Sequence, residues 1–379
     1  MARNQNPDFF SILPEELLST IVSCLPFKEA AKTSIFSNGW RRVWHRTKNI
    51  EFNENFFVVD GEIKPDMFIG FLRRWIENYP EPVINKFSLT YCEPRLYHED
   101  MWNSILFALD KHVKVMEINF YDPYDDHDIV GPVFELPMEF YMYGEFESLQ
   151  LFGCTLYGDK FTNFGFLKQL SLGYIELPAS TLMPILDICG GLESLCLTMC
   201  WNIGSVFVTT PHLFLRSLII ERCTDFDSLS IEAPNLRFLK CSGRLCVINF
   251  RGWKRIEEAD FNFVYGRLEE FDKFCCMFWP LNIKVLTIGS DLLKVYKFVG
   301  LFRVLMICSG DNPMRLALSP SSIIKHLILK TEIQENEFFG IKYFLNICLV
   351  LEMLTIDISH DNTSDKVNII SVISSDDPN

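Results

Sequence analysis

The nine residues Leu192-Glu-Ser-Leu195-Cys-Leu197-Thr-Met-Cys200 contain the pattern on which the fold depends. Apolar side chains stand at the first, fourth and sixth positions, and a cysteine follows at the ninth. The alternation of Leu195 and Leu197 is the period of a strand with one buried face. The same pattern begins again at Ile84, Phe146 and Leu215, with closing cysteines at Cys92, Cys154 and Cys223. The chain is therefore expected to repeat one short structural unit.

Looser copies keep the apolar triplet without the cysteine. They begin at Val113, Leu167, Ile283, Phe302, Ile324 and Leu351, and weaker ones begin at Leu236 and Ile256. The mean spacing of about 24 residues lies inside the range of roughly 20 to 29 residues that leucine-rich repeats have. One unit cannot bury its apolar face alone, so neighbouring units must stack. We predict an α/β leucine-rich-repeat solenoid (a horseshoe) over residues 80–360, with a parallel sheet on its concave side.

Thirteen cysteines occur in the chain. A small, weakly polar thiol suits the turn after each strand, where it can meet backbone groups. A zinc site would need clustered Cys or His pairs, and the sequence has none at the required spacing. The acidic run from Asp122 to Asp128 lacks the glycine and closing glutamate of an EF-hand loop. We therefore expect no metal and no other cofactor.

The segment before the repeats has the features of short helices. Pro14 suits the start of a helix, and the two glutamates that follow it favour the positive end of the helix dipole. Apolar side chains then form one stripe, and Pro26 ends the helix. The stripe consists of Leu17, Leu18, Ile21 and Leu25.

Two more helices are expected before residue 50. The second runs from Lys28 to Phe36, with Ala30, Ala31 and Ile35 turned inward. The third begins at about Gly39 and places Trp40, Val43 and Trp44 on one face. Three helices in so few residues make a small core, so we expect a partner to supply the missing apolar surface. The alternative is that these helices only cap the repeat array.

Residues 13–44 resemble an F-box, and specifically the F-box/leucine-rich-repeat proteins of plants. The matching features are two Leu-Pro pairs, a Leu-Leu pair between them and a closing Trp-Arg-x-x-Trp. The resemblance implies docking on the Skp1-type linker, and through it on the cullin, of a ubiquitin ligase. The implied Skp1-binding residues are Leu13, Pro14, Leu17, Leu18, Ile21, Leu25, Pro26, Trp40, Val43 and Trp44.

The sequence departs from the family at Asn38 and Gly39, where such proteins usually carry Lys-Arg. A glycine costs a helix about 1 kcal/mol relative to alanine. We therefore expect the third helix to begin late or its docking to be weaker.

The segments predicted from these features are an F-box at 8–52, a connecting segment at 53–79, the solenoid at 80–360 and a tail at 361–379, disordered at its end. On the concave sheet of the solenoid, residues between the buried strand positions should face outward, where they suit the binding of a protein, a peptide or a small polar ligand. The predicted target-binding residues are Gln150, Phe152, Thr198, Glu221, Lys240, Asp260 and Asn262.

The net charge of −14 disfavours nucleic acid and anionic membrane as partners, because phosphate groups would be repelled. Residues 1–50 are the exception, with seven Lys/Arg against four Asp/Glu. The polar start, Met1 to Asn6, lacks the apolar core of a signal peptide, and no apolar run reaches the ~18 residues of a membrane helix. We expect a cytoplasmic or nuclear protein with reduced thiols.

Three functions were compared on these features. The first is a non-catalytic substrate adaptor of an SCF (Skp1-cullin-F-box) ubiquitin ligase. The second is a leucine-rich-repeat binding module that works without the ligase, and binding to Skp1 separates the two. An enzyme is disfavoured, because the seven histidines are scattered and no nucleophile elbow, phosphate loop or dinucleotide fingerprint occurs.

Overall fold

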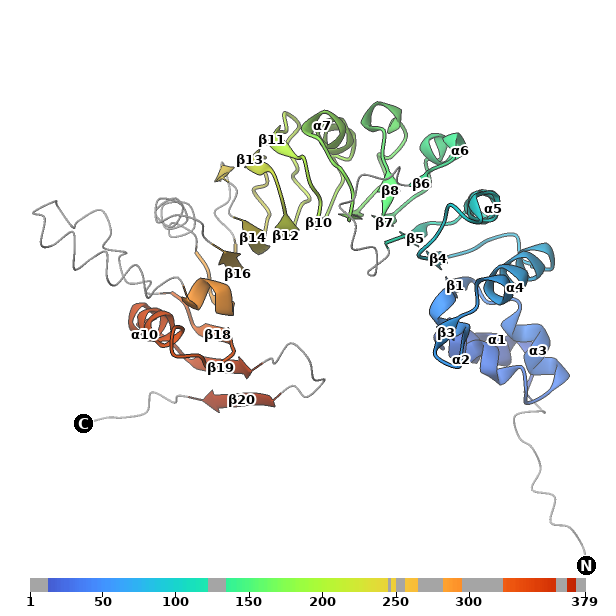
Figure 1. The fold of residues 1–379 in the computed structure, drawn as a ribbon, viewed down its shortest axis with the longest axis horizontal. Helices are drawn as coiled ribbons and strands as arrows, with labels where there is room; N and C mark the ends of the chain where they lie inside the picture. The colour runs from blue at the N-terminus through green and yellow to red at the C-terminus, as the bar shows by residue number, and fades with distance from the viewer. Residues whose placement is uncertain are drawn as a thin grey trace, which may run out of the picture. The chain divides into compact units, whose positions relative to one another are not determined.

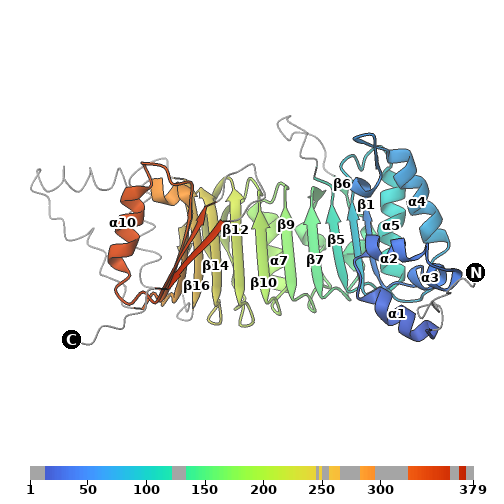
Figure 2. The same ribbon diagram turned by 90° about the horizontal axis from the view of Figure 1, so that it is seen from below.

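A computed structural model describes residues 13–121, 134–244, 247–249, 256–264, 282–294, 323–358 and 367–372. The chain divides into two compact units, Met1–Leu167 and Lys168–Asn379. Each unit contains a row of short, mostly parallel strands with helices on one side (Figures 1 and 2).

Three short helices open the first unit: α1 (Glu15–Ser23), α2 (Phe27–Thr33) and α3 (Asn38–Trp44). Pro14 and Pro26 immediately precede α1 and α2, where the absent proline N–H is not needed. Ser37 caps α3, because its hydroxyl oxygen accepts a hydrogen bond from the backbone N–H of Trp40. Helix α3 therefore begins before Gly39, and the expectation of a late start is wrong.

The sheet of the first unit has the order β1-β4-β5-β7. Its strands are β1 (Asn49–Asn53), β4 (Lys86–Thr90), β5 (Val115–Asn119) and β7 (Ser148–Phe152). Helices α4 (Pro65–Glu77), α5 (His98–Asp110) and α6 (Met138–Met142) lie on one side of these strands in Figure 1. Short elements connect them: η2 (Glu54–Phe56), β2 (Val58–Val59), β3 (Glu62–Ile63), β6 (Phe134–Glu135), β8 (Cys154–Thr155) and η3 (Gly158–Lys160).

The sheet begins one strand earlier than the sequence pattern indicated. Strand β1 pairs in register with β4, Ile50 against Phe87 and Phe52 against Leu89. The first apolar position of this repeat is filled by Thr47, which is buried although polar. The predicted start at residue 80 missed this strand because the repeat template asks for an apolar residue there.

An aromatic cluster joins the three N-terminal helices to the first repeat. The ring of Phe27 lies 5.8 Å from Trp44 and Trp75 and 5.9 Å from Phe52, measured between ring centroids. Phe52 also lies 5.8 Å from Phe87 of the next strand. The apolar surface that the three helices lack is therefore supplied by β1 and α4 of the same chain, and not only by a partner.

The second unit has the strand order β9-β10-β12-β14-β16-β17-β18-β19-β20. The first eight pair in parallel. They are β9 (Gln169–Gly173), β10 (Ser194–Thr198), β12 (Ser217–Cys223), β14 (Phe238–Arg244), β16 (Glu258–Val264), β17 (Val285–Ile288), β18 (His326–Thr331) and β19 (Met353–Ile358). Strand β20 (Val367–Val372) pairs antiparallel with β19, so the segment predicted as a tail contains a strand.

Helix α7 (Ala179–Ile188), helix α10 (Phe338–Ile347) and a second small sheet cover the other side of this unit in Figure 1. The small sheet consists of β11 (Gly204–Phe207), β13 (Phe226–Ser230) and β15 (Val247–Asn249), paired in parallel.

The predicted apolar triplets are the buried positions of the strands. Ile84, Phe87 and Leu89 are fully buried, and so are the corresponding residues from Val113 onward to Leu329 wherever the structure describes them. The copy that begins at Phe302 lies outside the described residues, as does the acidic run from Asp122. The last triplet, from Leu351, is only half-buried. The repeat prediction and its register are thus correct for most of the sheet.

Cys200 lies just after its strand and Cys223 is the last residue of β12, close to the turns predicted for them, whereas Cys154 begins the short strand β8. Residues just before them, such as Met199 (φ 49°) and Arg222 (φ 51°), have left-handed backbones that turn the chain away from the strand. The buried Cys200 thiol then donates to the carbonyl of Leu172, and Cys223 donates to Leu197. These two thiols thus bond to the preceding strand, whereas the Cys154 thiol donates to the carbonyl of Phe152 in its own repeat.

Candidate functional site: docking face and strand face

The structure divides the predicted Skp1-binding residues into two groups. Buried members form the core of the three helices, and exposed or half-exposed members cover the outside of α1 and its flanks. The buried group is Leu18, Trp40, Val43 and Trp44; the accessible group is Leu13, Pro14, Leu17, Ile21, Leu25 and Pro26. Leu17 is 51% exposed and Ile21 is 38% exposed. Only the accessible group can touch a partner without unfolding the helices.

Two exposed apolar residues were missed by the sequence analysis. Ile35 is 79% exposed and Phe36 is 65% exposed, although Ile35 was expected to point inward. Helix α2 runs from Phe27 to Thr33 and buries Phe27, Ala30 and Thr33. Ile35 therefore lies beyond the end of the helix and outside its buried face. Pro26, directly before the helix, is the signal from which the start of α2 at Phe27, and hence its buried positions, could have been predicted. We define the docking face as Leu17, Ile21, Ile35 and Phe36.

Two ion pairs link α3 and the residues that follow it to neighbouring parts of the unit. Arg42 of α3 donates to the carboxylate of Glu15 at the start of α1, at 2.8 Å, and Arg46 pairs with Glu81 at 2.6 Å. Both arginines are more than half exposed, so each pair contributes little to stability. Their effect is to orient α3 against α1 and against the first repeat.

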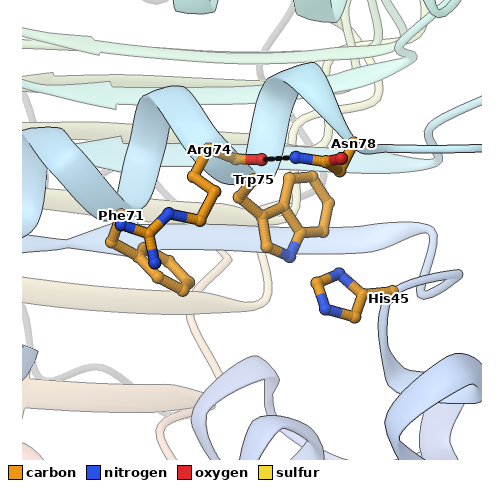
Figure 3. A pocket seen from close by; sticks show the side chains of 5 residues that line it. All are labelled: His45, Phe71, Arg74, Trp75 and Asn78. Atoms are coloured by element: carbon orange, nitrogen blue, oxygen red, sulfur yellow. Dashed lines mark hydrogen bonds between the residues drawn. The ribbon is translucent and has the colours of Figure 1, made fainter.

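A hollow of about 360 Å³ opens between the end of α3 and helix α4. Its lining is His45, Phe71, Arg74, Trp75 and Asn78 (Figure 3). Phe71, Arg74 and Trp75 of α4 and its C-cap Asn78 follow one another at helical spacing and so share a face. Figure 3 shows the Trp75 indole projecting from α4 with its ring nitrogen on the side of His45. None of these lining residues carries a signal in the sequence that predicts the hollow.

The strand face is the side of each sheet that carries the half-exposed residues between the buried positions. In the first unit it includes Gln150 and Phe152 of β7, as predicted from the pattern. In the second unit the register places Thr198 beside Glu221 and Lys240 beside Asp260. The predicted target-binding residues of this unit therefore lie on adjacent strands.

Charges on the strand face of the second unit are paired with one another. Glu221 forms an ion pair with Lys240, and Asp260 pairs with Lys330 at 2.7 Å. Burial lowers the pKa of Lys240, but the Glu221 carboxylate beside it raises this pKa, and the net result lies above the ordinary value. A target that approaches here meets two neutralised pairs, so specificity would come from shape and hydrogen bonding more than from net charge.

Asn262 has its hydrogen-bonding groups occupied within the chain. Its Oδ1 accepts from the backbone N–H groups of Asp291 (3.0 Å) and Leu292 (3.4 Å), and its Nδ2 donates to the Asp291 carboxylate (3.1 Å). The side chain thus caps the helical turn at residues 290–294. This internal role is an alternative to the target contact predicted from the sequence.

Apolar side chains on the strand face were also missed. Ile219 and Ile328 stand at the middle outward position of their strands, in register with Lys240 and Thr287, and Phe238 stands two residues earlier, in register with Ser217. All three are half-buried by their neighbours. Phe152 is the only apolar residue among the predicted target-binding residues, although the two-residue period of the strands places these three side chains outward as well.

The part of the chain that the structure describes contains no helix long and apolar enough to cross a membrane. Nor do its His, Cys, Asp and Glu side chains form a group of three or more that could hold a metal ion.

Comparison with known proteins agrees with this architecture. Residues 10–51 match the F-box domain, and residues 136–376, more than half of the chain, match the family described as At1g61320/AtMIF1, LRR domain. The chain belongs to the plant F-box/LRR family. The F-box matches the three helices, and the LRR domain matches most of the repeats.

Relatives from Arabidopsis thaliana extend over nearly the whole chain. The F-box protein At3g62230 is 26% identical over 92% of this chain and 76% of its own length. The F-box/LRR-repeat protein At3g03360 is 26% identical over 92% of this chain and 70% of its own length. A further relative, At1g56400, is 28% identical over 94% of this chain and 76% of its own length.

Proposed function

We propose that this F-box/LRR protein is the substrate-recognition adaptor of an SCF-type ubiquitin ligase. In this role the three helices dock on a Skp1-type protein, and through it on the cullin, while the strand face binds a target protein. The chain itself carries out no chemistry. It brings the target close to a recruited ubiquitin-conjugating enzyme, so that high local concentration replaces catalysis by this chain.

The observation that supports docking is the exposure of Leu17, Ile21, Ile35 and Phe36 on such a small helical unit. Leu17 and Ile21 lie on α1, and Ile35 and Phe36 follow α2; several large apolar side chains exposed on one small unit are typical of an interaction surface. The helices already have an internal core, formed with β1 and α4. A partner is therefore needed to cover the docking face and not to fold the helices.

Direct binding of the full chain to a purified Skp1-type protein tests the proposal. The variant Leu17→Asp with Ile21→Asp should lose binding, since two charges would be buried without partners. Ser19→Asp with Ser23→Asp is the matched control, because both serines are exposed residues of the same helix and the pair receives the same two charges. This control should bind like the unmodified chain.

Failure of the unmodified, folded chain to bind at micromolar concentration would favour the ligase-independent binding module instead. A location in the cytoplasm or nucleus is part of the same proposal, since the ligase would have to be reached there.

A further inference from the structure

The hollow beside α4 adjoins the helices α1–α3, but most of its lining residues come after these helices in the sequence. His45 directly follows Trp44, the last residue of α3. The other four lining residues belong to α4 or its cap, in the range 52–135 that lies between the two matched domains. Any binding role of this part of α4 is thus additional to the F-box itself.

The wall of the hollow is aromatic. The His45 ring lies 4.4 Å from Trp44 and 6.5 Å from Trp75, measured between centroids, and is stacked on the latter. Burial lowers the pKa of His45, so its imidazole is uncharged at neutral pH. Phe71 adds a half-buried ring to the same lining. An aromatic or large aliphatic side chain would find apolar contacts here.

The polar groups of the hollow include one buried donor and one exposed cation, neither of them paired with a described residue. Trp75 is 2% exposed, and its indole N–H has no hydrogen-bond partner among the described residues. Arg74 forms no ion pair with any residue described, whereas Arg42, Arg46 and Arg73 each pair with a carboxylate. A buried donor without a partner costs free energy until an acceptor arrives. The missing group is therefore an acceptor, and Arg74 favours a carboxylate.

The form of the hollow favours a protein side chain over a small molecule. Arg74 and Asn78 are exposed at its rim, and a small ligand would remain largely in water, while ligand pockets usually enclose most of the ligand. Single aromatic anchors that fill a hollow are common at the centre of protein interfaces. The basic excess of the first fifty residues also favours an acidic partner surface.

We propose that this hollow receives an aromatic side chain and a neighbouring carboxylate from the Skp1-type protein that docks on α1–α3, so that the interface continues from α3 onto α4. The inference rests on the proposed function. The partner's ring would lie against His45, Phe71 and Trp75, and its carboxylate would accept from Arg74 and from the Trp75 indole N–H.

Affinity measurements on the full chain test this extension. Arg74→Gln should weaken binding of the Skp1-type protein about fivefold and Arg74→Glu more than about tenfold. Arg73→Gln removes the same charge from the neighbouring residue, which pairs with Asp100 outside the hollow, and should change affinity less than about twofold. Binding that is equally strong in all three variants would overturn the inference and leave the proposed function standing, whereas no binding by the unmodified chain would overturn both.

A second readout reports on the hollow itself. The indole N–H resonance of Trp75 should shift when the Skp1-type protein is added, whereas that of Trp102, which donates to the Glu135 carbonyl at 2.8 Å, should not. The Trp75→Phe variant assigns the resonance. A Trp75 resonance that ignores the protein and moves with micromolar phenylacetate would assign the hollow to a small molecule and overturn the inference.

Discussion

The indole of Trp75 meets the ring of Phe52 edge-on, with 5.3 Å between their centroids. Trp75 belongs to α4 and Phe52 to the first strand of the sheet, and both also contact Phe27 of the second docking helix. The docking helices and the first repeat therefore share one core and should unfold together.

Trp75→Ala should lower the free energy of unfolding by about 3 to 5 kcal/mol, because it removes a buried aromatic side chain and leaves a cavity. Urea unfolding followed by circular dichroism would measure the loss. Phe166→Ala is the control, since Phe166 is 75% exposed and should change stability by less than about 0.5 kcal/mol.

A fragment of residues 1–60 lacks Trp75 and therefore lacks part of the shared core, so it should not unfold cooperatively. A cooperative transition in that fragment would contradict the shared core.

Two helical glycines should respond to alanine with opposite signs. A Cβ added to Gly39 would meet Ser37 Oγ at 3.5 Å and Leu18 Cδ1 at 3.9 Å, which are ordinary contacts. Gly39→Ala should therefore stabilise the protein by up to about 1 kcal/mol through helix propensity.

A Cβ added to Gly340 of α10 would instead collide with the backbone of Leu293. Gly340→Ala should destabilise the second unit, because rigid backbone cannot move aside as a side chain can. Thermal unfolding of the two variants side by side gives the comparison. Destabilisation by Gly39→Ala would mean that this glycine has a role in the fold beyond the helix.

The sequence predicted the repeats well because their signal is local. Each triplet, such as Leu192, Leu195 and Leu197, reports burial through spacing alone, and stacking then fixes the sheet. The first strand escaped because the buried Thr47 replaces the apolar residue. The Thr47 carbonyl accepts a hydrogen bond from the hydroxyl of Tyr79. That contact joins residues 32 positions apart, and no local pattern encodes it.

The binding residues were harder to predict for a related reason. The motif marks Leu17 and Trp44 alike, yet one is exposed and the other is buried. Which face of each short helix becomes accessible is set by its packing on β1 and α4, far along the chain. The hollow at His45 and Trp75 arises only from that packing, so its residues carry no shared signal in the sequence.

His212 should make the second unit sensitive to acid. Its side chain is fully buried. Burial lowers the pKa of His212, against the opposing effects of the Asp187 carboxylate and the Leu186 backbone. Below about pH 6.5 the unfolded chain takes up a proton at this residue that the folded chain does not, so the free energy of unfolding falls as the pH falls.

Urea unfolding at about pH 7.5 and at about pH 5 would measure the effect, because these two values lie on either side of the ordinary histidine pKa of about 6.5. His212→Leu should flatten the decline with falling pH. His112→Gln is the control, because the His112 side chain is 61% exposed. An equal decline in His212→Leu and in the unmodified chain would contradict the assignment.

Asn262 offers the sharpest separation between a structural role and a target contact. If its main role is to hold the turn at residues 290–294, Asn262→Ala should leave the N–H groups of Asp291 and Leu292 without their acceptor and cost about 1 to 3 kcal/mol. Hydrogen exchange of these two amides should accelerate in the free protein, while amides of the distant β10 keep their protection. Ser242→Ala, on the neighbouring strand at the register position paired with Asn262, serves as the control and should leave both amides unchanged. Unaltered exchange and stability in Asn262→Ala would instead favour the target contact, and Asn262 would then be the residue to test first once a target is bound.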